Sequence, residues 1–401
     1  MKLAFLGITP AALAFAQNAL SAGHTVRELF DPNPINRDVL AAAADFRKRA
    51  DWENLLHERE FDAVIVAGPL THDTTDVECW QRREDQLRKL VQAGVPLIVI
   101  PPVCDAILGF ELEMIRRDVK GVILSYYPQA EHAVWREQLD RHKLYEQITV
   151  ERSLVSRSRG EVQAAFINDL EVLRHYLGPL RRISASGGVL REKARPELTN
   201  LSVSIIGTNA CSVRWSVVPA PTTAETRFTF YSATGTQSVT LAENAEAAIV
   251  FKELGTGQEE HLEKSNGAEV ILQQLQLALR GECVAAASWL DSCRNVEAME
   301  AIDRSLERSR TIDLYNEEHS EESSFKATMA VGGCLLLFVT LTVFIGVSML
   351  SVFWQPAHGD GRGWFLLQIG LIVPFAIFLL LQLLSFGLKA HQQRKRAGNQ
   401  D

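Results

Sequence analysis

The residues nearest the amino terminus that could do chemistry are one loop, Gly7-Ile8-Thr9-Pro10, and one later aspartate, Asp31. In a dinucleotide-binding loop, glycines let the backbone approach the pyrophosphate, and the helix that follows offers its free N–H groups. Here Thr9 stands where a second glycine is usual, and Pro10 has no N–H to offer. Asp31 is about where a carboxylate would accept the ribose hydroxyls, although it also begins the turn DPNP. The pattern indicates NAD or NADP binding as one interpretation and an ordinary turn as the other.

The elements around this loop decide between a signal peptide and a first strand, because MKLAFLGITPAALAFAQ also resembles a secretory signal. KLAFLG, PAALAFAQNALSAG and HTVRELFD read as a strand, a helix and a strand. The buried runs AVIVAGP, VPLIVIPP and KGVILSYYP continue the pattern, separated by amphipathic helices. Short apolar strands between such helices indicate a parallel sheet covered on both faces. We therefore predict a Rossmann-type, doubly wound domain over residues 1–125.

The pattern of apolar and polar residues changes from about residue 144. Segments such as ITVERSLVSR, RRISASGGVL and TRFTFYSATG alternate apolar and polar residues, which is typical of an antiparallel sheet. One helix around INDLEVLRHYLG interrupts them, and a helical region from about residue 267 to 309 precedes TIDLY. We expect an α+β domain with an open antiparallel sheet over 126–315, followed by an acidic linker over 316–326.

Two stretches near the carboxyl terminus contain no charged residue and exceed the roughly 20 residues that cross a bilayer. They predict transmembrane helices at 327–354 and 363–388, joined by a hairpin loop at 355–362. The tail, 389–401, is basic, whereas the loop has only Arg362, so the positive-inside rule places the tail in the cytoplasm. Two crossings return the amino-terminal domains to the same side. The expected location is therefore a multi-pass membrane protein with both parts cytoplasmic, and a buried helical hairpin of a soluble core is the alternative.

The composition excludes several kinds of partner. A chain of 401 residues exceeds a single core, and its net charge of -8 argues against nucleic acid, which requires a basic face. The six cysteines include no CxxC pair, so we expect thiols in a reducing compartment and neither a disulfide framework nor a metal site.

The order of these elements, with DAVIVAGPLTHD, GVPLIVIPP, INDLEVLRHYLGPLRRISASGG and the closing helix and TIDL strand, resembles the Gfo/Idh/MocA family. That family contains glucose-fructose oxidoreductase and inositol dehydrogenase, and the resemblance covers about residues 1–315. It implies oxidation or reduction of sugars or cyclitols with NAD(P), a sugar-like ligand, and homo-oligomers that pair through the antiparallel sheet. It also implies that Gly68 and Pro69 lie close to the nicotinamide.

The resemblance fails at the residues that would move protons. Where the family has Glu-Lys-Pro, this chain has Ile100-Pro101-Pro102, so Pro101 replaces the lysine that would polarise the reacting hydroxyl. Where the family has His-x-x-Asp, this chain has Asn168-Asp169-Leu170-Glu171. Asn168 cannot act as a general base near neutral pH, whereas Glu171 keeps a carboxylate. Other residues could supply a displaced proton acceptor: Tyr126, Tyr127, His132 and His175.

Three functions remain in competition. The first is a membrane-anchored, catalytically degenerate oxidoreductase homologue that binds a nucleotide or sugar-like ligand. The second is an active NAD(P)-dependent sugar or cyclitol oxidoreductase with a displaced base, and the third is a non-catalytic membrane scaffold that recruits a protein partner. Pro101 favours the first and third, because oxidising a secondary alcohol requires a base. Gly7, Asp31 and the Gly68-Pro69 pair favour the first over the third.

Overall fold

The computed structural model describes residues 1–30, 47–48, 51–57, 60–68, 77–132, 134–137, 145–190, 197–220, 222–242, 249–253, 259–262, 266–282 and 288–314, with 338, 342 and 345–346. The chain divides into two compact units, Met1–Asn316 and Glu317–Asp401, and both β-sheets belong to the first. Within the described part of the chain, no helix combines the length and apolarity needed to span a bilayer. Apart from 338, 342, 345 and 346, the expected linker, membrane hairpin and basic tail lie outside those residues.

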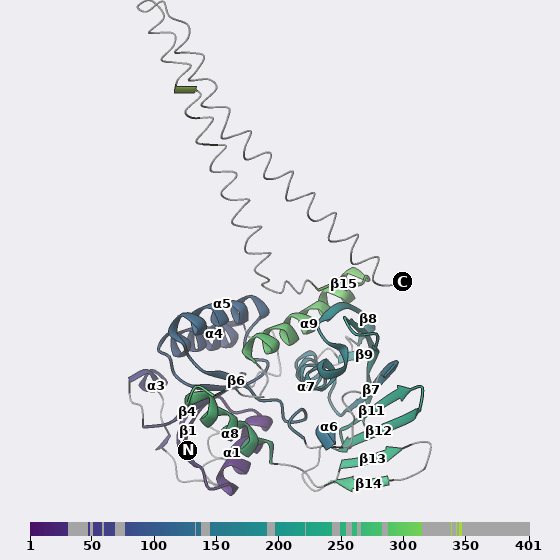
Figure 1. The fold of residues 1–401 in the computed structure, drawn as a ribbon, viewed down its shortest axis with the longest axis horizontal. Helices are drawn as coiled ribbons and strands as arrows, with labels where there is room; N and C mark the ends of the chain where they lie inside the picture. Colours follow the sequence, from purple (N-terminus) through teal and green to yellow (C-terminus); the bar gives the residue numbers. More distant parts are fainter. Residues whose placement is uncertain are drawn as a thin grey trace, which may run out of the picture. The chain divides into compact units, whose positions relative to one another are not determined.

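A six-stranded parallel sheet forms the amino-terminal half of the first unit (Figure 1). Its strands lie in the order β3-β2-β1-β4-β5-β6, which is the strand order of a Rossmann domain. The predicted fold of this half is therefore confirmed. The strands are β1 (Lys2–Leu6), β2 (Thr25–Phe30), β3 (Arg47–Lys48), β4 (Ala63–Ala67), β5 (Leu97–Ile100) and β6 (Ile123–Ser125).

Helices cover both faces of this sheet, which explains why its strands are apolar on both sides. Phe5 of β1 packs in one core with α1 (Pro10–Ser21), and Leu6 packs in the other with α4 (Val77–Gln92) and α5 (Ala106–Val119). The short α3 (Asn54–His57) contributes Leu55 to that second core. Lys2–Leu6 thus form the first strand of the parallel sheet, as predicted, and the structure places this strand between β2 and β4.

One helix of the first core comes from far along the sequence. α8 (Gly267–Leu279) buries Ile271 and Leu272 in the same cluster as Phe15 and Ala16 of α1. Its N-cap residue Asn266 also donates to the carbonyl of Asn18 at 3.3 Å. The Rossmann half is therefore completed by a helix that follows the strands of the other half.

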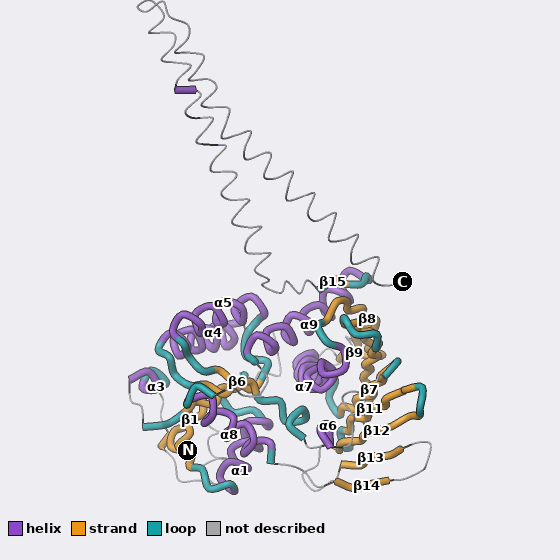
Figure 2. The backbone as a smooth tube through the Cα atoms, in the orientation of Figure 1, coloured by secondary structure: helices purple, strands orange, loops and turns teal. Residues whose placement is uncertain are grey.

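The second sheet has nine described strands in the order β14-β13-β12-β11-β7-β10-β9-β8-β15 (Figure 2). All neighbours are antiparallel except β7 and β10, so the expected antiparallel sheet contains one parallel pair. The path of the chain explains it, because the return through helix α7 leaves β8 running in the same direction as β7. The β8-β9-β10 meander then reverses the chain twice, so β10 also runs in that direction. The elements are β7 (Gln147–Leu154), α7 (Arg159–Leu177), β8 (Leu180–Leu190), β9 (Glu197–Gly207), β10 (Ser212–Pro219), β11 (Glu225–Ser232), β12 (Gly235–Ala242), β13 (Ile249–Glu253), β14 (Glu259–Leu262) and β15 (Ile312–Asp313), with the short α6 (Val134–Glu137) before β7.

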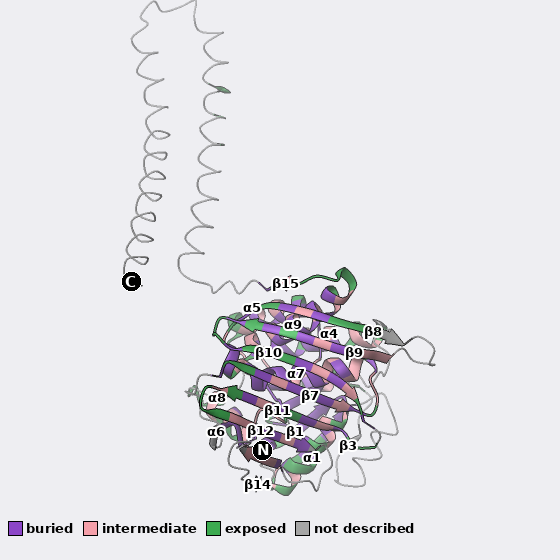
Figure 3. Ribbon diagram, turned by 90° about the vertical axis from the view of Figure 1, so that its right-hand side faces the viewer, coloured by how far each residue is buried: buried purple, intermediate pink, exposed green. Residues whose placement is uncertain are grey.

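Burial alternates along these strands, as the period-two pattern requires (Figure 3). On β10, Val213, Trp215 and Val217 are buried while Arg214 is exposed. The ring of Trp215 meets Phe166 of α7 edge to face, with centroids 5.2 Å apart. The buried face of the sheet therefore holds α7 in place.

The last long helix, α9 (Trp289–Arg308), joins the two halves because it packs against α5, α7 and β8. The indole of Trp289 donates to the carbonyl of Gly109 in α5 at 2.9 Å. A Cβ on Gly109 would lie 2.9 Å from Sγ of Cys293, so the glycine lets the two helices approach closely at this point.

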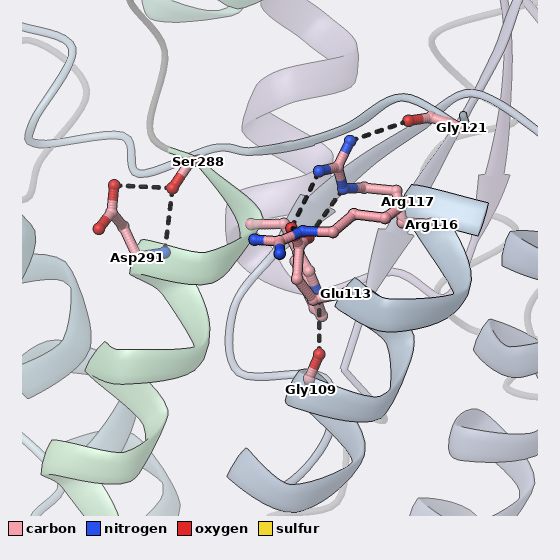
Figure 4. A network of polar contacts seen from close by, with 8 residues as sticks. Gly109, Glu113, Arg116, Arg117, Gly121, Ser288 and Asp291 are labelled. Atoms are coloured by element: carbon pink, nitrogen blue, oxygen red, sulfur yellow. Dashed lines mark hydrogen bonds and ion pairs between the residues drawn. The ribbon is translucent and has the colours of Figure 1, made fainter. Parts of the chain in front are cut away.

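A buried carboxylate, Glu113, stabilises α5 (Figure 4). Its oxygens accept from Nε and Nη2 of Arg116 at 2.7 and 2.9 Å, and from Nε of Arg117 at 2.7 Å. Burial by itself raises the pKa of Glu113, but the two guanidinium groups outweigh burial and hold that pKa below its usual 4.5. Arg116 also donates to the carbonyl of Gly121 at 3.2 Å, which ties the turn after the helix to this network.

Candidate functional site

A cleft of about 1240 Å³ is lined by residues from both halves of the first unit. It opens where β1 and β4 diverge in the strand order, the place where α/β sheets bind ligands. Several of the residues that the sequence singles out lie on its wall. The Rossmann half contributes Thr9, Pro10, Gly68, Pro101, Pro102 and Tyr126, and the other half contributes Gln129, His132, Arg152, Ala164 and Asn168.

Thr9 and Pro10 bring the amino-terminal end of α1 to the cleft. Oγ1 of Thr9 accepts from the N–H of Ala12 at 3.2 Å, and the Thr9 carbonyl accepts from the N–H of Leu13 at 2.9 Å. Pro10, at the first helical position, has no N–H. Within the described residues, the N–H of Ala11 is thus the donor that this turn still offers to an anion. The loop has fewer donors for a pyrophosphate than a glycine-rich loop would have.

Gly7 and Ile8 do not line the cleft, but they position the loop. Ile8 is buried in the first core, and Gly7 adopts a φ of 86°, in the left-handed region that favours glycine. A Cβ on Gly7 would lie 2.6 Å from Nη2 of Arg83 and 2.9 Å from the carbonyl oxygen of Ala67. Nη1 of Arg83 donates to the carbonyl of Leu6 at 2.9 Å. A buried guanidinium therefore lies directly behind the loop and helps to fix its backbone.

The ends of β4 and β5 meet at Gly68 and the Pro101–Pro102 pair, whose peptide bond is cis. A Cβ on Gly68 would lie 2.5 Å from the carbonyl oxygen of Pro102, so this contact also requires glycine. Pro101 lines the cleft without a group that can exchange a proton. The other two residues expected to bind the cofactor, Asp31 and Pro69, lie outside the described residues.

Asn168 of α7 lines the cleft from the opposite wall. Its Nδ2 donates to the carbonyl of Ala164, one turn earlier in the helix, at 2.9 Å. That bond fixes the side-chain amide against its own helix and leaves its oxygen as the acceptor. Asn168 can therefore orient a hydroxyl group, but it cannot remove a proton from it.

Glu171, the second candidate on α7, does not line the cleft. Its Oε2 accepts from Nδ2 of Asn295 on α9 at 2.6 Å and lies 3.8 Å from Nη1 of Arg174. Burial raises the pKa of Glu171 in spite of these partners. Tyr127 belongs to the same network, because its hydroxyl accepts from Nδ2 of Asn295 at 3.3 Å and also lies 2.6 Å from Oγ of Ser292. The structure places these two groups in the contact between α7 and α9.

Tyr126 and His132 line the cleft, whereas His175 is exposed on α7 and does not. Burial raises the pKa of Tyr126 above its ordinary value of 10, so at neutral pH its hydroxyl is a neutral donor. Nδ1 of His132 accepts from the N–H of Val134 at 3.1 Å, which places the proton of the neutral ring on Nε2. The Tyr126 hydroxyl can therefore donate a hydrogen bond to a ligand.

A buried ionic network on the cleft wall is absent from the sequence-based expectations. Arg152 of β7 lies 3.4 Å from Oδ1 of Asp169, a residue with no exposed surface. Asp169 also accepts from Nε1 of Trp215 at 2.8 Å. With the Gln129 amide turned to satisfy both groups, its nitrogen donates to Asp169 at 2.6 Å and its oxygen accepts from Arg152 at 2.6 Å. One feature of the sequence could have indicated this network. In ITVERSL the apolar residues alternate with polar ones, and Arg152 occupies a position that faces the core.

The chemistry of the cleft contains no metal site within the described residues, where no group of three His, Cys, Asp or Glu side chains is arranged to hold an ion. The cleft wall carries hydrogen-bond donors and acceptors, and its lining also includes the acidic residues Glu84, Asp105, Glu161, Glu300 and Asp303. The cleft can therefore orient a ligand through hydrogen bonds.

Comparisons with known proteins identify the fold. No family model matches the chain, and a search of curated protein sequences finds no match. Among solved structures, the UDP-N-acetylglucosamine 3-dehydrogenase of Acidithiobacillus ferrooxidans is 16% identical with a TM-score of 0.60, and the match covers 77% of this chain and 98% of that one. An oxidoreductase of Agrobacterium radiobacter in complex with NAD+, L-tartaric acid and magnesium is 13% identical with a TM-score of 0.59, covering 78% and 98%.

A third structure is the aldose-aldose oxidoreductase of Caulobacter crescentus complexed with glycerol. It is 12% identical with a TM-score of 0.62, and the match covers 78% of this chain and 99% of that one. At these identities the likeness concerns the fold. The first unit of this chain therefore has the fold of the Gfo/Idh/MocA-type oxidoreductases.

Proposed function

We propose that the chain is a membrane-anchored homologue of NAD(P)-dependent oxidoreductases that binds NAD or NADP and a sugar-like ligand with little or no hydride transfer. The observation that carries the proposal is the composition of the cleft wall. The two positions where the resemblance expects a lysine and a histidine are Pro101 and Asn168, and both line the cleft. The architecture for binding is present while the groups for proton transfer are replaced.

Cofactor binding is supported by the loop and by the structural relatives. A solved neighbour holds NAD+, and another is a dehydrogenase of a nucleotide sugar. In this chain the end of α1 opens into the cleft, and the Arg83 guanidinium lies behind the loop. The N–H that Pro10 lacks and the side chain of Thr9 weaken the cradle, and one lost hydrogen bond costs about 1 kcal/mol. We therefore expect an affinity roughly five- to tenfold below that of a glycine-complete loop.

Loss of hydride transfer follows from the absence of a free base at the expected positions. Oxidising a secondary alcohol requires a group that takes the hydroxyl proton, and neither a proline ring nor an amide can do so near neutral pH. Tyr126 is held in its neutral form by burial. One observation favours an active enzyme instead, because the imidazole of His132 lines the cleft. That imidazole could accept a proton on Nδ1 only if the hydrogen bond from the N–H of Val134 were broken first.

Membrane anchoring is supported by the sequence alone. The uncharged stretches at 327–354 and 363–388 are each long enough to cross a bilayer, and the tail after them is basic. On this proposal the first unit and the tail are both cytoplasmic, and the cleft acts at the membrane surface.

The test is a titration of the full chain in detergent with NADH and NADPH, followed by nicotinamide fluorescence. The expected result is saturable binding without cofactor turnover over a panel of sugars and cyclitols. The double variant Pro101→Lys with Asn168→His should gain turnover, and Pro101→Ala with Asn168→Ala is the matched control that should not. Turnover by the unaltered chain would contradict the proposal that hydride transfer has been lost. No binding by a folded chain would favour a scaffold.

A further inference from the structure

Arginines gather where the chain leaves the first unit. Five of them are exposed on three neighbouring elements, and we name them the exit patch: Arg181 and Arg182 of β8, Arg304 and Arg308 of α9, and Arg310 in the turn that follows. β15 pairs with β8, and α9 leads directly into β15, so these elements adjoin (Figure 1). Two exposed carboxylates, Glu307 and Asp313, lie among them. The excess of positive charge is notable because the whole chain carries a net charge of -8.

Among the described residues, few carboxylates pair with the arginines of the exit patch. Nε of Arg182 lies 2.9 Å from Oδ1 of Asp313, and both side chains are largely exposed. Within the part of the chain that the structure describes, no ion pair joins Arg181, Arg304, Arg308 or Arg310 to a carboxylate, although Arg304 interacts electrostatically with Glu297 and Glu300 of its own helix. An exposed guanidinium with no carboxylate partner is available to an anion outside the protein.

The backbone that carries the exit patch is fixed. Oγ of Ser305 accepts from the N–H of Ala185 in β8 at 2.9 Å and donates to the carbonyl of Arg310 at 2.7 Å. Leu314, the last described residue of the unit, donates its N–H to the carbonyl of Arg181 at 2.7 Å. The arginines are thus presented by a rigid surface beside the point where the chain departs.

We infer that the exit patch binds the anionic headgroups of the membrane to which the chain is anchored. This inference rests on the proposed membrane anchor. The twelve residues 315–326 that separate Leu314 from the first apolar stretch span at most about 40 Å, so the patch is held close to the bilayer. Clustered arginines next to a membrane segment are attracted to acidic lipids, and guanidinium groups bind phosphate through paired hydrogen bonds. Contact with the bilayer surface would fix which way the cleft faces.

The acidic linker is the competing occupant. Glu317, Glu318, Glu321 and Glu322 follow Leu314 closely and carry the charge that the exit patch attracts. Contact with this linker would not depend on the lipid, whereas contact with headgroups requires an anionic bilayer and weakens as salt screens it. The lipid composition therefore separates the two.

The experiment reconstitutes the full chain into nanodiscs of phosphatidylcholine, and into discs in which part of it is replaced by phosphatidylglycerol. Arginine side chains are labelled with phenylglyoxal, and the rate at each site is measured by mass spectrometry. We expect labelling of Arg304, Arg308 and Arg310 to be several-fold slower in the anionic discs, and to recover at high salt. Arg27 and Arg227, which are exposed on other strands, should label equally in both.

Two variants sharpen the result. Arg308→Glu with Arg310→Glu should return the labelling of Arg304 in anionic discs to its rate in neutral discs. The matched control, Arg27→Glu with Arg227→Glu, should leave the protection of the exit patch intact. Equal labelling in both kinds of disc would overturn the inference, as would slow labelling in both that disappears when the four linker glutamates become glutamines.

Extraction with alkaline carbonate tests the anchor separately. A chain that resists extraction but labels equally in both discs keeps the anchor and refutes the lipid contact. A chain that carbonate releases, yet whose exit patch is protected by anionic lipid, refutes the anchor and supports the contact.

Discussion

Two glycines with nearly the same backbone conformation provide a test of the loop geometry. Gly7 has a φ of 86° and Gly23, after α1, has a φ of 82°. A Cβ on Gly23 would meet nothing within 4 Å, whereas one on Gly7 would meet Nη2 of Arg83 at 2.6 Å and the carbonyl oxygen of Ala67 at 2.9 Å. Alanine at the two positions therefore suffers the same backbone penalty but a different steric one.

The expected magnitudes follow from this difference. A left-handed conformation costs a residue with a Cβ roughly 1 to 2 kcal/mol, and that cost applies to both Gly7→Ala and Gly23→Ala. Overpacking typically costs about 1 to 3 kcal/mol more, and it applies to Gly7→Ala alone. The Arg83 side chain can shift, but the Ala67 carbonyl is backbone of the central strand β4 and cannot. Gly7→Ala should therefore destabilise the protein by about 1 to 3 kcal/mol more than Gly23→Ala.

The assay is unfolding of the full chain in denaturant, followed by tryptophan fluorescence, with an NADH titration of each folded variant. Gly7→Ala should show the lower midpoint and weaker cofactor binding, because its loop is displaced. Gly23→Ala should bind NADH as the unaltered chain does. Equal midpoints for the two variants would refute the argument that Arg83 and Ala67 confine the loop.

Two further predictions concern buried charges. Asp169→Asn leaves Arg152 without its carboxylate partner and weakens the hydrogen bond from Trp215, so it should lower the free energy of unfolding by about 3 to 5 kcal/mol. Asp313→Asn breaks an exposed ion pair, so it should lower the free energy of unfolding by under about 1 kcal/mol. Thermal midpoints of the two variants measure the contrast, and equal losses would contradict it. The pKa of Glu113 is lowered in the folded state, so its contribution to stability is present above pH 4.5 and is lost as the pH falls through the depressed pKa. Glu113→Gln should therefore lose less stability on acidification than the unaltered chain, as measured by unfolding midpoints at neutral and acidic pH.

Most of the fold could be predicted because the period of the apolar residues is unambiguous in both sheets. Strands such as AVIVA are buried on both faces, so they appear as unbroken apolar runs, while the strands of the other sheet alternate. Two features escaped this reasoning. The direction of β10 depends on how many times the chain reverses after β7. The packing of α8 against α1 cannot be predicted from the sequence of α8, because an apolar helix face does not specify which element covers it.

The candidate site was predicted in part, for reasons of helix geometry. Asn168 was expected at the ligand site and lines the cleft, but Glu171 and His175 on the same helix do not. They lie about 4.5 and 10 Å further along the helix axis, beyond the part of α7 that faces the cleft. The sequence indicates only that these residue types can exchange a proton. Whether they reach the cleft depends on their position along the helix axis. The Arg152–Asp169 pair was missed because a buried charge is recognisable only when its partner is known.

Retention of glycine at the loop does not by itself indicate a bound cofactor. Gly7 is required by Arg83 and Ala67, and Gly68 is required by the Pro102 carbonyl, so packing alone would preserve both in a scaffold without a ligand. Thr9 and Pro101, which line the cleft, stand where the resemblance expects a glycine and a lysine. The glycines therefore cannot separate a binding protein from a scaffold, and saturable NADH binding by the folded chain can, because a scaffold without a ligand site would not produce it.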